Sequence, residues 1–273
     1  MNRETSYLID NSIAPMFPQE QSDNDYWSTA REPWPSLLFI LPFLIVYEVG
    51  AIAHAHVPAS RNGADLWIRH FGMETGVAVE WMFPLLAPIL LLIWQFAAQR
   101  PWNWNLETLS GMFAESLMFA MTLVVIGQVT ALAFPLEVAV ELSVTPLSRA
   151  VSFLGAGIYE EMLFRLTMLP LIFAALRVIR LPRSLAIFGS IMISSWLFAT
   201  AHYVGSPALF SPDELTQAMT TVCESRELWF SYTFRFVAGI LFSILFWVRG
   251  FGIAVGCHIL YDLFVGVILA GIG

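Results

Sequence analysis

The residues of this chain that could do chemistry are a few ionisable side chains set inside apolar stretches. Glu160, Glu161 and Arg165 lie in the segment YEEMLFR. On a helix, Glu161 and Arg165 share a face, so their charges can neutralise each other. Glu160 points about 100° away from Glu161 and has no oppositely charged neighbour within its own turn. A carboxyl group alone in an apolar bundle needs a partner such as a histidine, and that pair can act as a general base.

Two histidines are candidate partners. His258 and Asp262 are four residues apart in GCHILYDL, so the carboxylate can fix the tautomer and orientation of the imidazole. His202 ends an apolar stretch in WLFATAHYVG. Counted from arginines at the membrane surface, Glu160 and His202 lie at depths of roughly 25 and 28 Å, and His258 at about 14 Å. We therefore expect Glu160 and His202 to meet, whereas His258 requires a deeper turn at Arg249, a tilted helix or a less compact site.

The other ionisable residues of the apolar stretches fit structural roles. We interpret Glu48, Glu80 and Glu115 as polar contacts between helices. Arg235 could pair with any of these carboxylates, and we assign it no catalytic role.

The elements that must position these residues are membrane helices. Hydrophobic residues make up 58% of the 273 residues and charged residues 12%, and the mean hydropathy is +0.69, which leaves too little polar surface for a soluble globule. Apolar runs of about 20 residues recur, the length that crosses a bilayer, and the alternating segments of a membrane β-barrel are missing. The sequence predicts an all-α, polytopic membrane helix bundle of about seven transmembrane helices, at 35–54, 78–98, 111–134, 148–179, 184–203, 229–248 and 251–271.

Charge outside the spans predicts the organisation of the chain. Residues 1–34 are an acidic tail without the apolar core of a signal peptide, residues 35–134 hold the N-terminal transmembrane helices, and residues 145–266 hold the later spans with Glu160, His202 and His258. Arginines gather at 177–183 and follow the second and sixth spans, which predicts a cytoplasmic N-terminus in the plasma membrane of the cell, although Arg61 and Arg69 oppose it. The net charge of −8 argues against a nucleic-acid partner.

The same residues resemble the motifs of a known family, the CPBP or CAAX protease-like (ABI) intramembrane endopeptidases. The resemblance covers roughly residues 145–266, and four motifs appear in order on four separate predicted spans. They are Glu-Glu-x-x-x-Arg at Glu160, Glu161 and Arg165, Phe-x-x-x-His at Phe198 and His202, Phe-x-x-Gly at Phe236 and Gly239, and His-x-x-x-Asn/Asp at His258 and Asp262. Prenyl-CAAX endopeptidases of this family usually carry Asn at the last position, so Asp262 is a departure, and an ionised Asp can only accept hydrogen bonds.

The resemblance implies a glutamic endopeptidase that hydrolyses a peptide bond inside the membrane. Glu160 would activate a water that His202 also holds, while His258 and Asp262 would act on the oxyanion side of the transition state. Arg165 would hold Glu161 in place. The expected partners are the lipid bilayer and a membrane-embedded or membrane-anchored peptide substrate, as in the C-terminal processing of membrane-anchored or prenylated CAAX-type proteins.

Two alternatives remain open on the sequence. Glu160, His202 and His258 could be three ligands of a catalytic zinc ion with an open position, although the sequence has no His-Glu-x-x-His motif, and we favour a site without a metal cofactor. The chain could also be a non-enzymatic membrane transporter, or an immunity or scaffold protein, that binds a peptide in the same cavity.

Overall fold

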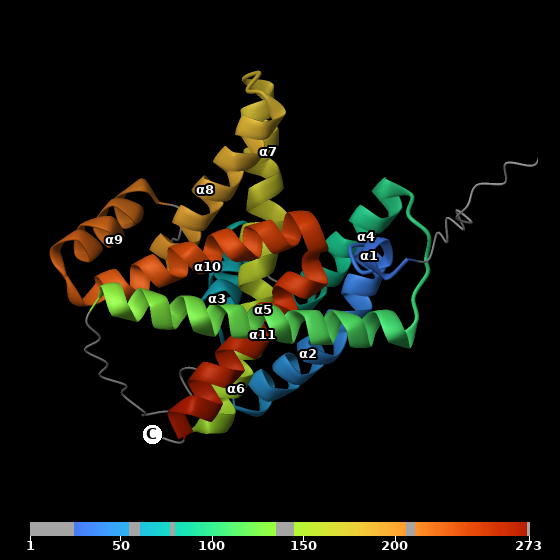
Figure 1. The fold of residues 1–273 in the computed structure, drawn as a ribbon, viewed down its shortest axis with the longest axis horizontal. Coiled ribbons are helices and arrows are strands. Elements are labelled where there is room, and N and C mark those ends of the chain that lie inside the picture. Colours follow the sequence, from blue (N-terminus) through green and yellow to red (C-terminus); the bar gives the residue numbers. More distant parts are fainter. Residues whose placement is uncertain (1–24, 55–60, 77–79, 135–144, 206–210, 272–273) are drawn as a thin grey trace, which may run out of the picture.

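The computed structural model describes residues 25–54, 61–76, 80–134, 145–205 and 211–271, and most of these residues are helical, with no strand among them (Figure 1). The predicted all-α fold is confirmed. The α-helices are α1 (Tyr26–Thr29), α2 (Pro33–Ala53), α3 (Gly63–Glu74), α4 (Leu86–Ala98), α5 (Leu106–Ala133), α6 (Pro146–Gly155), α7 (Leu169–Val178), α8 (Arg183–Ala201), α9 (Pro212–Glu224), α10 (Glu227–Arg249) and α11 (Phe251–Leu263). Short 3₁₀ or π-helical elements are η1 (Glu80–Leu85), η2 (Ala156–Glu160), η3 (Met162–Met168), η4 (Phe264–Ile268) and η5 (Leu269–Gly271).

The polytopic membrane bundle is confirmed as well. Five described helices are long and apolar enough to cross a membrane, at Pro33–Ala53, Leu106–Ala133, Arg183–Ala201, Glu227–Arg249 and Phe251–Gly271. Of the other two predicted spans, the one at 78–98 contains a shorter apolar helix at Met82–Ala98. Residues 78 and 79 of this span lie outside the described part. The span at 148–179 is helical from Pro146 to Val178, through α6, η2, η3 and α7. The cytoplasmic N-terminus stays a prediction.

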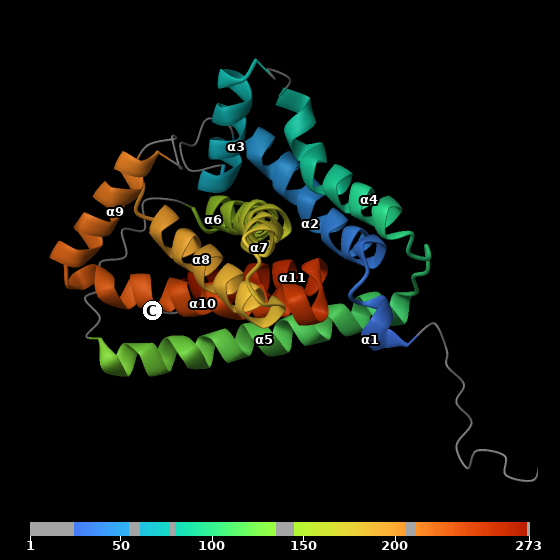
Figure 2. The ribbon, with the colours of Figure 1, turned by 90° about the horizontal axis from the view of Figure 1, so that it is seen from above.

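Helix α11 lies at the centre of the bundle. It packs against α5, α10 and α2, and Figure 2 shows α5 along one side with α2 and α4 on the other. Its residues from Phe251 to Ile259 are all buried. Gly157 in η2 meets α11 so closely that a Cβ atom there would lie 2.3 Å from Cγ1 of Ile259. The absent side chain lets the helix with Glu160 approach the helix with His258.

The helix that carries YEEMLFR is not a regular α-helix. Its middle is π-helical at Ala156–Glu160 and Met162–Met168, on both sides of Glu161. π-Helical turns are uncommon and occur frequently at functional sites, because the wider turn changes the direction in which side chains point. Glu160 and Glu161 are thus presented by a locally widened helix.

Two helices lie in connections where no element was expected. The amphipathic helix α9 occupies the acidic connection between α8 and α10. Helix α3 follows α2 and contacts η2, and its N-cap is Asn62, whose side chain accepts a hydrogen bond from the amide of Ala64. Of the acidic tail, residues 1–24 lie outside the described part, and the remainder forms α1 and the start of α2.

Candidate active site

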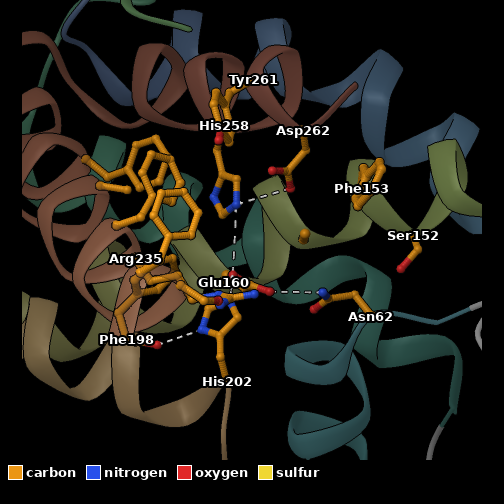
Figure 3. A pocket seen from close by; sticks show the side chains of 16 residues that line it. Asn62, Ser152, Phe153, Glu160, Phe198, His202, Arg235, His258, Tyr261 and Asp262 are labelled. Carbon is orange, nitrogen blue, oxygen red and sulfur yellow. Dashed lines mark hydrogen bonds and ion pairs between the residues drawn. The ribbon is translucent and has the colours of Figure 1, made fainter. Parts of the chain in front are cut away.

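Three elements bring the predicted site residues to one cavity of about 400 Å³ (Figure 3). Glu160 comes from the end of η2, His202 from the residue after α8, and His258 from α11. Asp262 follows one turn after His258 and lines the same cavity. The rest of the lining is largely aromatic or small and apolar, which gives the charged groups a surrounding of low polarity.

Glu160 is the carboxylate at the centre of the cluster. Its Oε1 accepts a hydrogen bond of 3.0 Å from Nδ2 of Asn62. Its Oε2 is buried, has no hydrogen-bond partner among the described residues, and lies 3.6 Å from Nε2 of His202 and 3.9 Å from Nε2 of His258. One carboxylate oxygen is therefore held in place while the other faces two imidazoles.

The site is compact although counting residues placed His258 at a smaller depth than the others. The turn after Arg249 is buried against α1 and α5, where Arg249 contacts Glu115 and the backbone of Trp27. The α7–α8 hairpin instead projects beyond the bundle, at the top of Figure 1. A buried turn at Arg249 and a projecting α7–α8 hairpin fit the first of the three explanations given above, a turn at Arg249 that lies deeper than the other.

His202 is oriented by its own helix. Its Nδ1 lies 2.8 Å from the carbonyl oxygen of Phe198, an acceptor, so Nδ1 carries the proton that makes this bond. The Phe198 ring and the imidazole pack in a T-shaped arrangement, with 4.9 Å between ring centroids. Nε2, the nitrogen that faces Glu160, is therefore left unprotonated in the neutral ring and can accept a hydrogen bond.

His258 has carboxylates on both sides. Its Nδ1 lies 2.8 Å from Oε1 of Glu161, and its Nε2 lies 3.4 Å from Oδ2 of Asp262. The ring of Phe242 stacks on the imidazole, with a centroid distance of 4.6 Å and an interplanar angle of 14°. Asp262 was expected to orient this ring, but the shorter contact comes from Glu161.

Glu161 and Arg165 form a fully buried pair behind the cavity. Nη1 of Arg165 donates to Oε1 of Glu161 at 3.1 Å, and Nη2 donates to the carbonyl oxygen of Gly239 at the same distance. The guanidinium lies over the ring of Phe198, 4.3 Å from its centroid. A Cβ at Gly239 would lie 3.1 Å from Cα of Ser195, so glycine lets α10 pack close to α8. These contacts join the first three motifs.

Asn62 is a site residue that the motifs do not contain. Its Oδ1 caps α3, so the amide group is oriented with Nδ2 toward Glu160. The preceding residue, Arg61, bonds to Asp65 at 2.8 Å, and Tyr159 donates to Glu48 at 2.6 Å nearby. Burial lowers the pKa of the Arg61 guanidinium, but the hydrogen bond to Asp65 and its charge raise this pKa above its ordinary value. The spacing of Asn62 and Asp65 is typical of a helix start, but it does not reveal the contact with Glu160.

The remaining ionisable residues differ in what they contact. Glu48 bonds to Tyr159, and Glu115 bonds to Arg249 and Tyr26, so both make polar contacts between helices. The side chain of Glu80 lies outside the described part. Arg235 lines the cavity and donates to the hydroxyls of Tyr203, at 3.2 Å, and Ser231. Within the described residues no carboxylate is in ion-pair contact with Arg235.

Comparison with known proteins identifies the C-terminal part of the chain. Residues 142–264 match the family model of the type II CAAX prenyl endopeptidase Rce1-like proteins. No curated protein and no solved structure matches the chain. Residues 142–264, in which all four motifs lie, are thus similar to the CAAX protease-like family of intramembrane proteases.

Proposed function

We propose that this membrane protein is an endopeptidase that hydrolyses a peptide bond with a water molecule activated by Glu160 and His202. The observation that carries the proposal is the position of Oε2 of Glu160, which is buried and without a hydrogen bond among the described residues. It lies 3.6 Å from Nε2 of His202 and 3.9 Å from Nε2 of His258. Both distances are too long for direct hydrogen bonds and suit a bridging water.

Each group has a role that its contacts allow. Oε2 of Glu160 takes one proton from the water, and Nε2 of His202 accepts a hydrogen bond from the other. As the water oxygen attacks the peptide carbonyl carbon, the carbonyl electron pair moves to its oxygen, which accepts a hydrogen bond from Nε2 of His258. When the C–N bond breaks, the leaving amine takes the proton from Glu160. The carboxylate is thereby regenerated.

The surrounding contacts support these roles. Glu161 is held by Arg165 and in turn holds Nδ1 of His258, which fixes the direction of the ring. Asn62 holds the Oε1 atom of Glu160, so that Oε2 faces the histidines. Asp262, which stands where relatives usually carry Asn, can only accept when ionised, and we assign it the task of keeping a proton on Nε2 of His258.

The surroundings of His258 favour chemistry without a metal ion. A metal ligand needs a free lone pair, which a histidine offers only from a nitrogen without a proton. Carboxylate oxygens face both ring nitrogens of His258, Glu161 at Nδ1 and Asp262 at Nε2, and each favours a proton on the nitrogen it faces. We therefore expect exhaustive chelation with EDTA or 1,10-phenanthroline to leave cleavage unchanged. Loss of cleavage that zinc restores would make Glu160, His202 and His258 zinc ligands instead.

The substrate class follows from the family and from the cavity. The apolar and aromatic lining, with Phe153, Phe230 and Phe234 among it, suits an apolar peptide segment. A site between membrane helices is reached most directly by a substrate that is itself in or anchored to the membrane. We propose C-terminal processing of such a protein, prenylated or otherwise membrane-anchored.

The experiment compares cells that produce the wild-type chain with cells that produce Glu160→Gln or His202→Ala. We expect an uncleaved precursor to accumulate in the membrane proteome of both variants, with the variant proteins still folded in the membrane. A transporter or a scaffold protein cleaves no substrate, so neither substitution would make a precursor accumulate. Normal processing of every membrane protein in both variants would overturn the proposed function.

A further inference from the structure

The cavity contains one cation that the proposed chemistry does not use. Arg235 comes from α10 and is the one arginine or lysine among the described residues that line the cavity. Its Nη1 donates to the hydroxyl groups of Tyr203 and Ser231, and no described carboxylate is in ion-pair contact with it. Its other guanidinium nitrogens have no described partner.

A permanent charge in a membrane-embedded cavity requires compensation. Guanidinium cannot lose its proton in a protein, and an unpaired charge in apolar surroundings is costly. The two carboxylates of the cavity are already engaged, because Glu160 faces Asn62 and both histidines and Asp262 faces His258. The missing counter-charge of Arg235 can therefore come from a bound ligand.

The groups around Arg235 form a site for a carboxylate. The hydroxyls of Tyr203 and Ser231 accept from Arg235, so the proton of each hydroxyl remains available to donate. The free nitrogens of a guanidinium match the two oxygens of a carboxylate in bidentate geometry. Since Arg235 is the one fixed cation of the described lining, and Glu160 and Asp262 line the same cavity, a singly charged carboxylate fits better than a doubly charged phosphate.

We propose that Arg235, with Ser231, binds the C-terminal carboxylate of the substrate, and this inference rests on the proposed function. A substrate that is apolar enough to enter the membrane needs no acidic side chain, but every polypeptide that ends in the cavity brings one carboxylate at its terminus. Arg235 and Glu160 line the same cavity, so binding at Arg235 would set the scissile bond a few residues before the end of the chain. Arg235 is thereby a residue that determines specificity.

The test measures binding to the full chain with Glu160→Gln, which does not consume the peptide. The probes are a decanoylated apolar tetrapeptide with a free C-terminal carboxylate, the same peptide as C-terminal amide, and an amide with glutamate at its last position. Dissociation constants are measured by calorimetry in detergent micelles. We expect the free acid to bind at least about tenfold more tightly than either amide, because an Arg–carboxylate pair is a strong charge-assisted contact.

Further substitutions identify the residue responsible. Adding Arg235→Gln should remove the preference for the acid and leave the affinity for the amide unchanged, which also shows that the fold is intact. Arg235→Lys should keep part of the preference. Arg226→Gln, an exposed arginine over Trp229 outside the cavity lining, should keep all of it.

Three results would overturn the inference. The first is that the free acid and the amide bind equally, or that no probe binds at millimolar concentration. The second is a preference for the acid that survives Arg235→Gln. The third is that the free acid and the glutamate-containing amide bind equally, which would mean that any carboxylate is recognised. The proposed function fails on a different result, cleavage that is unchanged by Glu160→Gln. The two failures are therefore distinguishable.

Discussion

Two carboxylates on apolar helices, Glu115 and Glu160, expose little of their side chains and have opposite surroundings. Both oxygens of Glu115 are bonded, since Arg249 binds it through two nitrogens and Tyr26 donates to Oε2 at 2.6 Å. Glu160 has one oxygen bonded to Asn62 and one that faces two imidazoles without a hydrogen bond among the described residues. The side chains are about equally buried, with 9% and 10% exposure. Burial alone therefore does not distinguish a structural carboxylate from a reactive one.

An oxygen without a hydrogen bond is also not sufficient by itself. Oε2 of Glu161 lacks a partner among the described residues too, but Glu161 is fully buried and does not line the cavity. Glu160 combines a free oxygen, two facing imidazoles and access to the cavity. The comparison with Glu115 teaches that this combination, not the charge, is what supports the proposed role of Glu160 as general base.

The largest effect on cleavage is expected for Glu160→Gln. Glutamine keeps the shape of the side chain and its contact with Asn62, but it cannot take a proton from water. We expect the cleavage rate per folded molecule to fall about 10⁴-fold, the upper range for a general base. Single-turnover cleavage of an identified substrate in liposomes measures it. A cleavage rate within tenfold of wild type would contradict the distinction drawn between Glu160 and Glu115.

Glu161→Gln should act on cleavage through His258. Loss of the carboxylate at Nδ1 removes the contact that directs the ring, so we expect about a 10²-fold lower rate per folded molecule. The buried Arg165 also loses its counter-charge, which should lower the free energy of unfolding by about 3 kcal/mol. The double variant Glu161→Gln/Arg165→Gln should regain stability without regaining cleavage. Recovery of both would make this pair structural only.

Asn62→Ala should reduce cleavage by about tenfold, because Oε1 of Glu160 loses its one hydrogen bond and the carboxylate can rotate. Asn62→Asp provides a sharper comparison, since it keeps the cap of α3 but places a second carboxylate beside Glu160. We expect that variant to be less active than Asn62→Ala although its helix is better capped. The reverse order would show that Asn62 serves α3 and not the site.

Glu115→Gln should leave cleavage per folded molecule unchanged. The change removes the counter-charge of Arg249, so the free energy of unfolding should fall by about 1–3 kcal/mol. Less protein should therefore remain folded after heating in detergent. Thermal unfolding followed by tryptophan fluorescence, together with the cleavage assay, separates the two effects. A loss of cleavage as large as for Glu160→Gln would remove the distinction between the two carboxylates.

The sequence predicted the helical membrane fold and the meeting of Glu160 with His202, because both depend on apolar run lengths and on spacing within single helices. It did not predict that Glu161 makes the shorter contact to His258, since Asp262 on the same helix was the expected partner and only packing between helices brings Glu161 to the ring. Asn62 was missed for a similar reason. Its contact with Glu160 joins residues 98 positions apart, and no local pattern reports such a pairing.

The depth of His258 shows where counting residues fails. The count assumed that all arginine-containing turns lie at one membrane surface, but Arg249 is buried and bonded to Glu115. That Arg235 contacts hydroxyl groups and no described carboxylate could not be predicted either, because several carboxylates were within reach of it in principle. Charge pairing between helices depends on their relative rotation, which a single sequence does not determine.

The most direct test of the central claim is cleavage in water enriched in ¹⁸O by the purified chain in liposomes, supplied with a solubilised membrane-protein fraction and followed by mass spectrometry of new peptide termini. We expect new C-termini that carry one ¹⁸O with the wild-type chain and with Glu115→Gln, and none with Glu160→Gln. The same labelled termini with Glu160→Gln would contradict the assignment of Glu160 as the residue that activates water.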